Sequence, residues 1–371
     1  MTKKEILRAT SFLLVVCITL FVLCDLFEQE NGGNSDRSFN TYRSLETDTV
    51  DAVFIGTSGV SFYWVSPLAY EEYGMTVYNL GVDAVPAWLY ISIIEEAMAY
   101  QKPELFLLDI RPFTAGTVSC DKMDAQARVV LDAMAPLSAN RLKTGLRTMK
   151  TMHSAYPETP RFDISYFLSF VKYHPKATDS SYRISHNLGQ RMQKYGGFRL
   201  DAGLSAVVAE QPGNKYDPNA VHDLGELYEA ALYELLDYIR EADLQVLFVD
   251  TPKVLDSKSG KANRIAQILQ EEGFDFLTYV DLPKDGTFPL EIDYKTDFFN
   301  EGHVNFYGAE KYTRALATYL DAHYDLPDRR EDPKAQRDWS GLYQKLRVDF
   351  EKIREDTVAR GNQIIGDPLE G

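Results

Sequence analysis

The chain is poor in cysteine and in basic side chains. Only three of its 371 residues are cysteine, and two of these, Cys17 and Cys24, lie in an apolar stretch near the N-terminus. Cys120 is the single cysteine of the remaining sequence, so no disulfide can form within that part of the chain. Lysine and arginine number 39 against 55 aspartate and glutamate residues, which sets the net charge at −16. So acidic a chain argues against nucleic acid as a partner and against binding to anionic headgroups.

A metal-ligand pattern is also missing. His153, His174 and His186 are far apart in the sequence, and neither cysteines nor clustered carboxylates accompany them. Zinc sites combine such ligands at much closer spacing. We therefore expect no metal site and no cofactor.

Long hydrophobic runs are absent except for one. Residues 9–24 form an apolar run of about 16 residues, near the lower limit for a helix that crosses a bilayer. Lys3, Lys4 and Arg8 precede the run, and no small-x-small pattern for signal cleavage follows it. These features predict an uncleaved signal anchor at residues 1–27 and a single-pass protein of the cell membrane. By the positive-inside rule, everything after the anchor would be extracytoplasmic.

Strand-like and helix-like segments alternate in two parts of the sequence. Short apolar runs at 53–55, 75–84 and 104–112 are separated by segments with helical spacing or helix-end residues. The same alternation returns after Asp223 and ends with a helix at 307–323. Because parallel strands need crossover helices, this pattern predicts an α/β fold with a parallel sheet and helices on both faces.

The predicted domain organisation follows from where this alternation begins and stops. Beyond the anchor, the predicted parts are a polar juxtamembrane spacer at 28–49, an α/β domain at 50–112 and 220–325, a largely helical inserted cap region at 113–219 and a C-terminal helical extension at 326–371.

Two short stretches indicate hydrolytic or acyl-transfer chemistry. Ser58 lies in Gly-Thr-Ser-Gly directly after the first predicted strand, where side chains of an α/β sheet face the ligand crevice. His303 lies in Asp-Phe-Phe-Asn-Glu-Gly-His, just before the 307–323 helix. A serine nucleophile needs a base within hydrogen-bond reach and a third group that orients the base, and the three can be far apart in sequence.

These two stretches together resemble the SGNH (GDSL-type) hydrolase superfamily. In that family the nucleophilic serine stands in a Gly-Asp-Ser block, and the histidine closes an Asp-x-x-His block before the last helix. Here Thr57 replaces the aspartate, a pattern similar to the membrane-anchored branch that includes the teichoic acid D-alanylation protein and the alginate O-acetyltransferases. The resemblance implies a three-layer α/β/α fold of the flavodoxin-like kind, with Ser58 as the nucleophile and His303 as the base.

The resemblance leaves the third member of the triad open. The family places the acid three residues before the histidine, where this sequence has Asn300. An amide can hold an imidazole in the productive tautomer but stabilises the imidazolium less than a carboxylate does. Asp297 is the alternative, and the sequence does not decide between the two.

Three further residues are expected near the nucleophile. The block Asn-Leu-Gly-Val-Asp-Ala resembles the family's Asn-x-Gly-x-x-Gly, which implies that Gly81 and the backbone N–H of Ala84 belong to the oxyanion or substrate site. The third block of the family supplies an asparagine, whereas here a strand ends in Asp-Ile-Arg-Pro. Arg111 could act as a cationic donor, bind a substrate carboxylate or phosphate, or pair with Asp109.

Two classes of function remain open. The first is a membrane-anchored serine acyltransferase or esterase that acts on a cell-envelope polysaccharide, peptidoglycan or teichoic acid, and the anchored relatives imply an acyl exporter of the MBOAT kind as partner. The second is a non-catalytic protein of the same fold that binds envelope polymer or scaffolds an export complex, which the departures at Thr57, Asn300 and Arg111 permit.

Overall fold

The computed structural model divides the chain into two compact units. Unit 1 contains residues 1–40 and 118–192, and unit 2 contains residues 41–117 and 193–371. The residues that the structure describes are 2–27, 33–116, 118–135, 138–178, 194–200, 216–254, 258–279, 287–362 and 364. His186 and much of the predicted cap region, at 179–193 and 201–215, lie outside the described residues.

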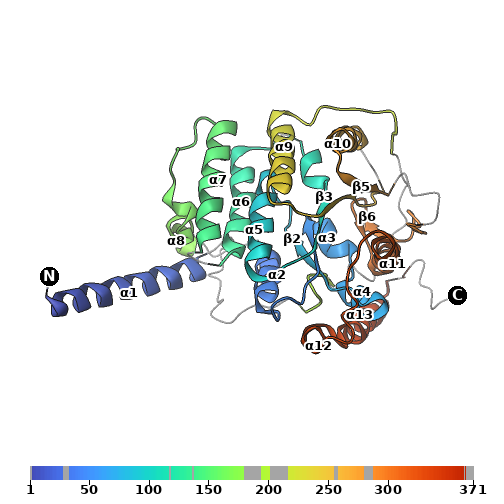
Figure 1. Cartoon of the computed structure of the whole chain (residues 1–371), viewed down its shortest axis with the longest axis horizontal. Coiled ribbons are helices and arrows are strands. Elements are labelled where there is room, and N and C mark those ends of the chain that lie inside the picture. The colour runs from blue at the N-terminus through green and yellow to red at the C-terminus, as the bar shows by residue number, and fades with distance from the viewer. Residues whose placement is uncertain are drawn as a thin grey trace. The chain divides into compact units, whose positions relative to one another are not determined.

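Within the described residues, the centre of unit 2 is a five-stranded parallel sheet (Figure 1). Its strands are β1 (Ala52–Gly56), β2 (Val77–Gly81), β3 (Leu105–Asp109), β4 (Val246–Asp250) and β5 (Asp275–Thr278). The order across the sheet is β2-β1-β3-β4-β5, which is the flavodoxin-like order of doubly wound sheets. The prediction of a three-layer α/β/α fold is confirmed.

The strands form because each is a run of apolar residues that can be buried on both faces of the sheet. All five residues of β1 to β4 are buried, as expected for strands between two helical layers. Fully burying one such aliphatic or aromatic side chain contributes about 1.5–3 kcal/mol. The carboxyl ends of these parallel strands meet at one edge, which is where Ser58 follows β1 and Arg111 follows β3.

One face of the sheet is covered by four helices whose side chains share one hydrophobic core with the strands. They are α3 (Ser58–Tyr63), α4 (Ser66–Tyr73), α11 (Phe306–His323) and α13 (Leu342–Ala359). On the other side, α5 contacts β1 and packs against α9, and α10 contacts β5. These three span Tyr90–Tyr100, Glu226–Glu241 and Ser259–Glu272.

Helix ends follow the capping residues that the sequence offers. Gly74, which ends α4, adopts a left-handed backbone with φ of 74°, where a side chain would be strained and would also collide with Asp328. Asn305 caps α11 by accepting a hydrogen bond from the N–H of Gly308. The second cap matters for the site because it begins the helix directly after His303.

The structure refines two of the predicted segments. The C-terminal extension contains two helices, α12 (Pro333–Trp339) and α13, separated by Gly341 with φ of 72°. The predicted spacer contains helix α2 (Gly33–Ser44), which its polar composition did not suggest; within unit 2, the hydroxyl of Tyr42 donates to the carbonyl of Ala97.

All of the regular secondary structure in the described residues of unit 1 is helical. Its longer helices are α1 (Lys3–Leu26), α6 (Cys120–Ala133) and α7 (Ala139–Ala155), and its short ones are α2, which it shares with unit 2, and α8 (Ser169–Tyr173). Helix α1 is the one helix of the described chain that is apolar and long enough to cross a membrane, over residues 3–24, and a signal sequence would meet the same criteria.

Candidate active site

Ser58 is held at the carboxyl edge of the sheet by close packing of the turn that carries it. It is the first residue of α3, and Thr57 before it caps the helix by accepting a hydrogen bond from the N–H of Gly59. A Cβ at Gly56 would lie 2.4 Å from Val60 and 2.6 Å from Asp109, so only glycine fits between β1 and β3 at this point. This close packing therefore fixes the backbone of the turn that carries the half-buried Ser58.

His303 lies far from Ser58 in the sequence but contacts it in the fold. It begins β7 (His303–Val304), which pairs antiparallel with β6 (Phe298–Asn300). The Nε2 atom of His303 lies 2.9 Å from the Ser58 hydroxyl oxygen. The Phe299 ring stacks on the imidazole, with ring centroids 5.5 Å apart and planes inclined by 7°. Ser58 and His303, the nucleophile and the base that we expect from the sequence, therefore lie within hydrogen-bond distance of each other.

The other imidazole nitrogen faces Asn300. Nδ1 of His303 lies 3.1 Å from the side-chain oxygen Oδ1 of Asn300. The same oxygen accepts the backbone N–H of Gly302 at 2.9 Å, which orients the amide with its oxygen toward the ring. With Oδ1 as acceptor, Nδ1 carries the proton and Nε2 is free to accept one from Ser58, which is the tautomer a general base requires.

Asp297 has different partners. One of its carboxylate oxygens accepts the backbone N–H of Asp293 at 2.6 Å and the ammonium of Lys311 at 2.8 Å. Its side chain is buried and joins the loop before β6 to α11. Of the two residues that the sequence left open, the structure places Asn300 beside His303 and ties Asp297 to the start of α11.

Arg111 braces the backbone around the site. Its guanidinium donates to the carbonyl of Gly302 at 2.7 Å and to the carbonyl of Pro252 at 3.0 Å, and it contacts the hydroxyl of Tyr63 at 3.0 Å. It also lies against the nucleophile turn, since a Cβ at Gly59 would be 3.1 Å from Nη1. Arg111 thus joins the exits of β3 and β4 to the loop that carries His303.

A buried carboxylate lies behind the nucleophile. Asp109, at the end of β3, accepts the Thr57 hydroxyl at 3.2 Å and the backbone N–H of Arg111 at 3.2 Å. Burial raises the pKa of Asp109, and the neighbouring Arg111 opposes that shift. A threonine at position 57 can donate to this carboxylate, whereas an aspartate there would place two acids against each other. The replacement of the family's aspartate by Thr57 is therefore compatible with Asp109 on the neighbouring strand.

The predicted oxyanion residues lie at the end of β2, the strand beside β1, and in the turn that follows it. Gly81 ends β2 in register with Gly56, and a Cβ at Gly81 would lie 2.1 Å from the hydroxyl of Ser61. Ala84 is exposed in the following turn and has φ of 54°, a left-handed conformation that disfavours alanine by about 1–2 kcal/mol. The family pattern has glycine at this position, which is the residue that such a backbone favours.

The base is kept neutral by its surroundings. Burial lowers the pKa of His303 to about 3, and the positive charges of Arg111 and Arg199 lower it in the same direction. Asn300 carries no charge and so cannot raise that pKa in the way a triad carboxylate would. His303 is therefore unprotonated near neutral pH and ready to accept a proton, but the imidazolium that would form is weakly stabilised.

Sequence reasoning missed two side chains of the site. The buried Tyr63 contacts the carbonyls of both Pro252 and Gly302, and burial raises the pKa of its hydroxyl to about 12. Arg199 bonds Asp83 at 2.9 Å, and its guanidinium lies 4.7 Å from the centre of the Phe62 ring. Tyr63 stands only five residues after Ser58, and this closeness was the available signal, whereas no local pattern marks Arg199.

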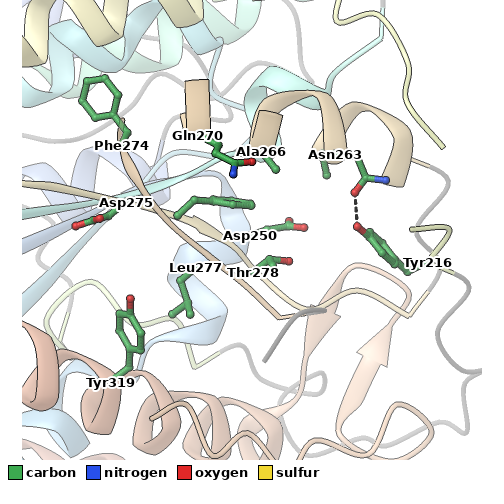
Figure 2. A pocket seen from close by; sticks show the side chains of 12 residues that line it. Tyr216, Asp250, Asn263, Ala266, Gln270, Phe274, Asp275, Leu277, Thr278 and Tyr319 are labelled. Atoms are coloured by element: carbon green, nitrogen blue, oxygen red, sulfur yellow. Dashed lines mark hydrogen bonds between the residues drawn. The ribbon is translucent and has the colours of Figure 1, made fainter. Parts of the chain in front are cut away.

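A cavity of about 530 Å³ lies elsewhere in unit 2 (Figure 2). It is lined by side chains of α10 and β5, by Asp250 at the end of β4, by Tyr319 of α11 and by Tyr216, whose hydroxyl bonds Asn263. Neither Ser58 nor His303 is among its lining residues. Across the described residues there is no group of three metal-ligating side chains. The candidate active site is therefore the open edge at Ser58, separate from this cavity.

Comparison of the sequence with models of protein families and with curated proteins finds no match.

Proposed function

We propose that the chain is a membrane-anchored, extracytoplasmic serine acyltransferase or esterase that acts on a cell-envelope glycan or related polymer through an acyl-enzyme. The observation that carries this proposal is the line of contacts from the Ser58 hydroxyl to Nε2 of His303 at 2.9 Å and from Nδ1 of His303 to Asn300 at 3.1 Å. A hydroxyl, a neutral base and an orienting acceptor in this order are what acyl transfer to serine requires.

The chemistry proceeds in two halves. Ser58 Oγ attacks the acyl carbon of the donor, its proton passes to Nε2 of His303, and the bond to the donor oxygen breaks as that oxygen takes the proton. In the second half, His303 removes a proton from an acceptor hydroxyl or from water, the acceptor oxygen attacks the acyl carbon, and the bond to Ser58 Oγ breaks as that oxygen takes the proton back from His303. We assign the oxyanion to the backbone N–H groups of Ser58 and Ala84.

The anchor and the substrate class belong to the same proposal. Helix α1, with Lys3, Lys4 and Arg8 on its N-terminal side, would cross the membrane with the rest of the chain outside. An enzyme tethered in this way stays close to envelope polysaccharide or teichoic acid, and an acyl exporter of the MBOAT kind would supply its donor.

A second candidate is a non-catalytic protein of the same fold that binds envelope polymer. It is favoured by the low pKa of His303 and by the amide of Asn300 in place of a carboxylate, because both features weaken the base.

Acylation of Ser58 separates the two candidates. The full-length protein in detergent or nanodiscs should release a burst of product from p-nitrophenyl acetate, and intact-mass spectrometry should find one added acetyl group. The Ser58→Ala variant should lose both signals. Ser61→Ala is the matched control, because Ser61 lies in the same short helix but does not contact His303 in the structure. A folded protein that forms no adduct with acyl esters or serine-directed phosphonates would be the binding protein.

A further inference from the structure

Outside α1, the described residues of unit 1 present four large apolar side chains to solvent. Leu142 and Leu146 on α7 are each 52% exposed, Phe162 is 63% exposed and Ile164 is 47% exposed. The two leucines are four residues apart and so lie on the same face of the helix. Such exposure is costly in water, and contiguous apolar surface of this kind marks an interaction site.

Phe167 lies between α7 and Phe162. The Phe167 ring packs onto α7 at Gly145, where a Cβ would lie 2.6 Å from the ring, and Gly145 stands between the two leucines in the sequence. The Phe162 ring lies 6.1 Å from the Phe167 ring. We call Leu142, Leu146, Phe162 and Ile164 the apolar patch.

The apolar patch lies close to the C-terminal end of α1. The hydroxyl of Ser169, on α8, donates to the carbonyl of Cys24 at 2.9 Å, and both residues are buried. Ser169 follows Phe167 by two residues, which span at most about 7 Å. Figure 1 shows α1 ending beside α8, which it contacts. A membrane that contains α1 therefore ends within reach of the apolar patch.

The charge of this segment is opposite to that of the chain. Residues 138–176 contain seven basic and two acidic side chains, whereas the whole protein has a net charge of −16. Lys150 is exposed on α7, and Lys172 of α8 is 44% exposed while it bonds Asp124. Basic residues beside exposed leucine and phenylalanine are the composition of a surface that lies in a membrane interface. The negative net charge of the whole chain therefore does not apply to residues 138–176.

We propose that the apolar patch inserts into the boundary between headgroups and acyl chains of the bilayer that α1 crosses, with the neighbouring basic side chains at anionic headgroups. The proposal rests on the membrane anchoring of α1 that is part of the proposed function. The bilayer is the occupant that the structure favours, because the Ser169–Cys24 hydrogen bond ties the segment that carries the patch to the end of α1, and because that segment is basic.

Tryptophan fluorescence in vesicles tests this placement. Trp64, Trp88 and Trp339 are all buried, so a new surface tryptophan can be followed over a constant background. The full-length Phe162→Trp variant is reconstituted in vesicles of phosphatidylcholine and phosphatidylglycerol with brominated acyl chains. A tryptophan at the interface should lose roughly half of its added fluorescence relative to unbrominated lipid.

Two further variants separate this proposal from the anchor. Phe12→Trp, within α1, reports whether the anchor is in the bilayer, because that residue is 68% exposed and would face lipid. Quenching of Phe12→Trp without quenching of Phe162→Trp would contradict insertion of the apolar patch and would support the membrane anchor. Absence of quenching of Phe12→Trp would contradict the membrane anchor. Quenching of Phe162→Trp would still show separately whether the apolar patch inserts. Adding Leu142→Glu and Leu146→Glu to Phe162→Trp should abolish the quenching at position 162, and persistence of that signal would contradict insertion.

Discussion

The side-chain oxygen of Asn300 lies 3.1 Å from Nδ1 of His303, at the position where a serine triad ordinarily has a carboxylate. The Gly302 N–H holds that oxygen in place, so the imidazole has the tautomer of a base without a negative charge behind it. If the site is catalytic, the orientation of His303 comes from hydrogen bonding alone. The first two predictions below test this separation of orientation from charge.

Asn300→Ala and Asp297→Ala should have different effects. Removing the Asn300 amide frees the imidazole to rotate, and loss of the orienting group should reduce ester turnover by on the order of 10²–10⁴-fold. Asp297→Ala should change turnover by only a few-fold, because its partners are Lys311 and the N–H of Asp293. Its cost should appear in urea unfolding as about 1–3 kcal/mol, since the hydrogen bonds from the Asp293 N–H and from Lys311 to the buried carboxylate would be lost. Loss of turnover in the Asp297 variant with full activity in the Asn300 variant would reverse the assignment.

The pH dependence of ester turnover should show the low pKa of His303. The base works only when unprotonated, and a pKa near 3 places the fall in kcat/KM in acid far below the usual histidine value of about 6.5. Activity should therefore be nearly constant between about pH 5 and 8. Asn300→Asp places a negative charge beside Nδ1, which raises the pKa of His303 and should move the acid limb to higher pH. A wild-type limb near pH 6.5, or an unmoved limb in Asn300→Asp, would contradict this account.

Arg111 should prove to be a positioning residue. Arg111→Met removes the donors to the Gly302 and Pro252 carbonyls and should destabilise the fold by roughly 2–3 kcal/mol in urea unfolding. It also removes a positive charge near His303, so the pKa of that imidazole, followed by NMR of the ring protons, should rise. Arg111→Lys keeps the charge but cannot serve both carbonyls and should keep the low pKa with part of the destabilisation. An unchanged pKa in the methionine variant would exclude the electrostatic part of this role.

The anchored topology predicts a defined protease pattern. Protease added to intact protoplasts should degrade everything except a short N-terminal fragment that contains α1, because the positive charges at the N-terminal end of α1 hold that end in the cytoplasm. Permeabilised protoplasts provide the control, in which the cytoplasmic tip also becomes accessible. Full protection of the chain in intact protoplasts would refute the topology and the envelope substrate together.

The fold could be predicted from the sequence because its signals are local. Strands β1, β3 and β4 are apolar runs that end in polar or turn residues, and α4 has proline near its start and glycine after its end. Ser58 and His303 were recognisable for a similar reason. Each stands in a short motif at the end of a strand or before a helix, where the local chain alone limits what the residue can do.

The partners of the site residues could not be predicted because they depend on contacts between distant segments. The pairing of β6 with β7 has an irregularity between Phe298 and Asn300 that sets Asn300 opposite His303, while Asp297 is left outside the hairpin against α11. Arg111 accordingly meets Gly302, 191 residues away. A shift of one residue in that hairpin would exchange the side chains that face His303, and such a register is decided by packing against the sheet, which composition and spacing do not encode.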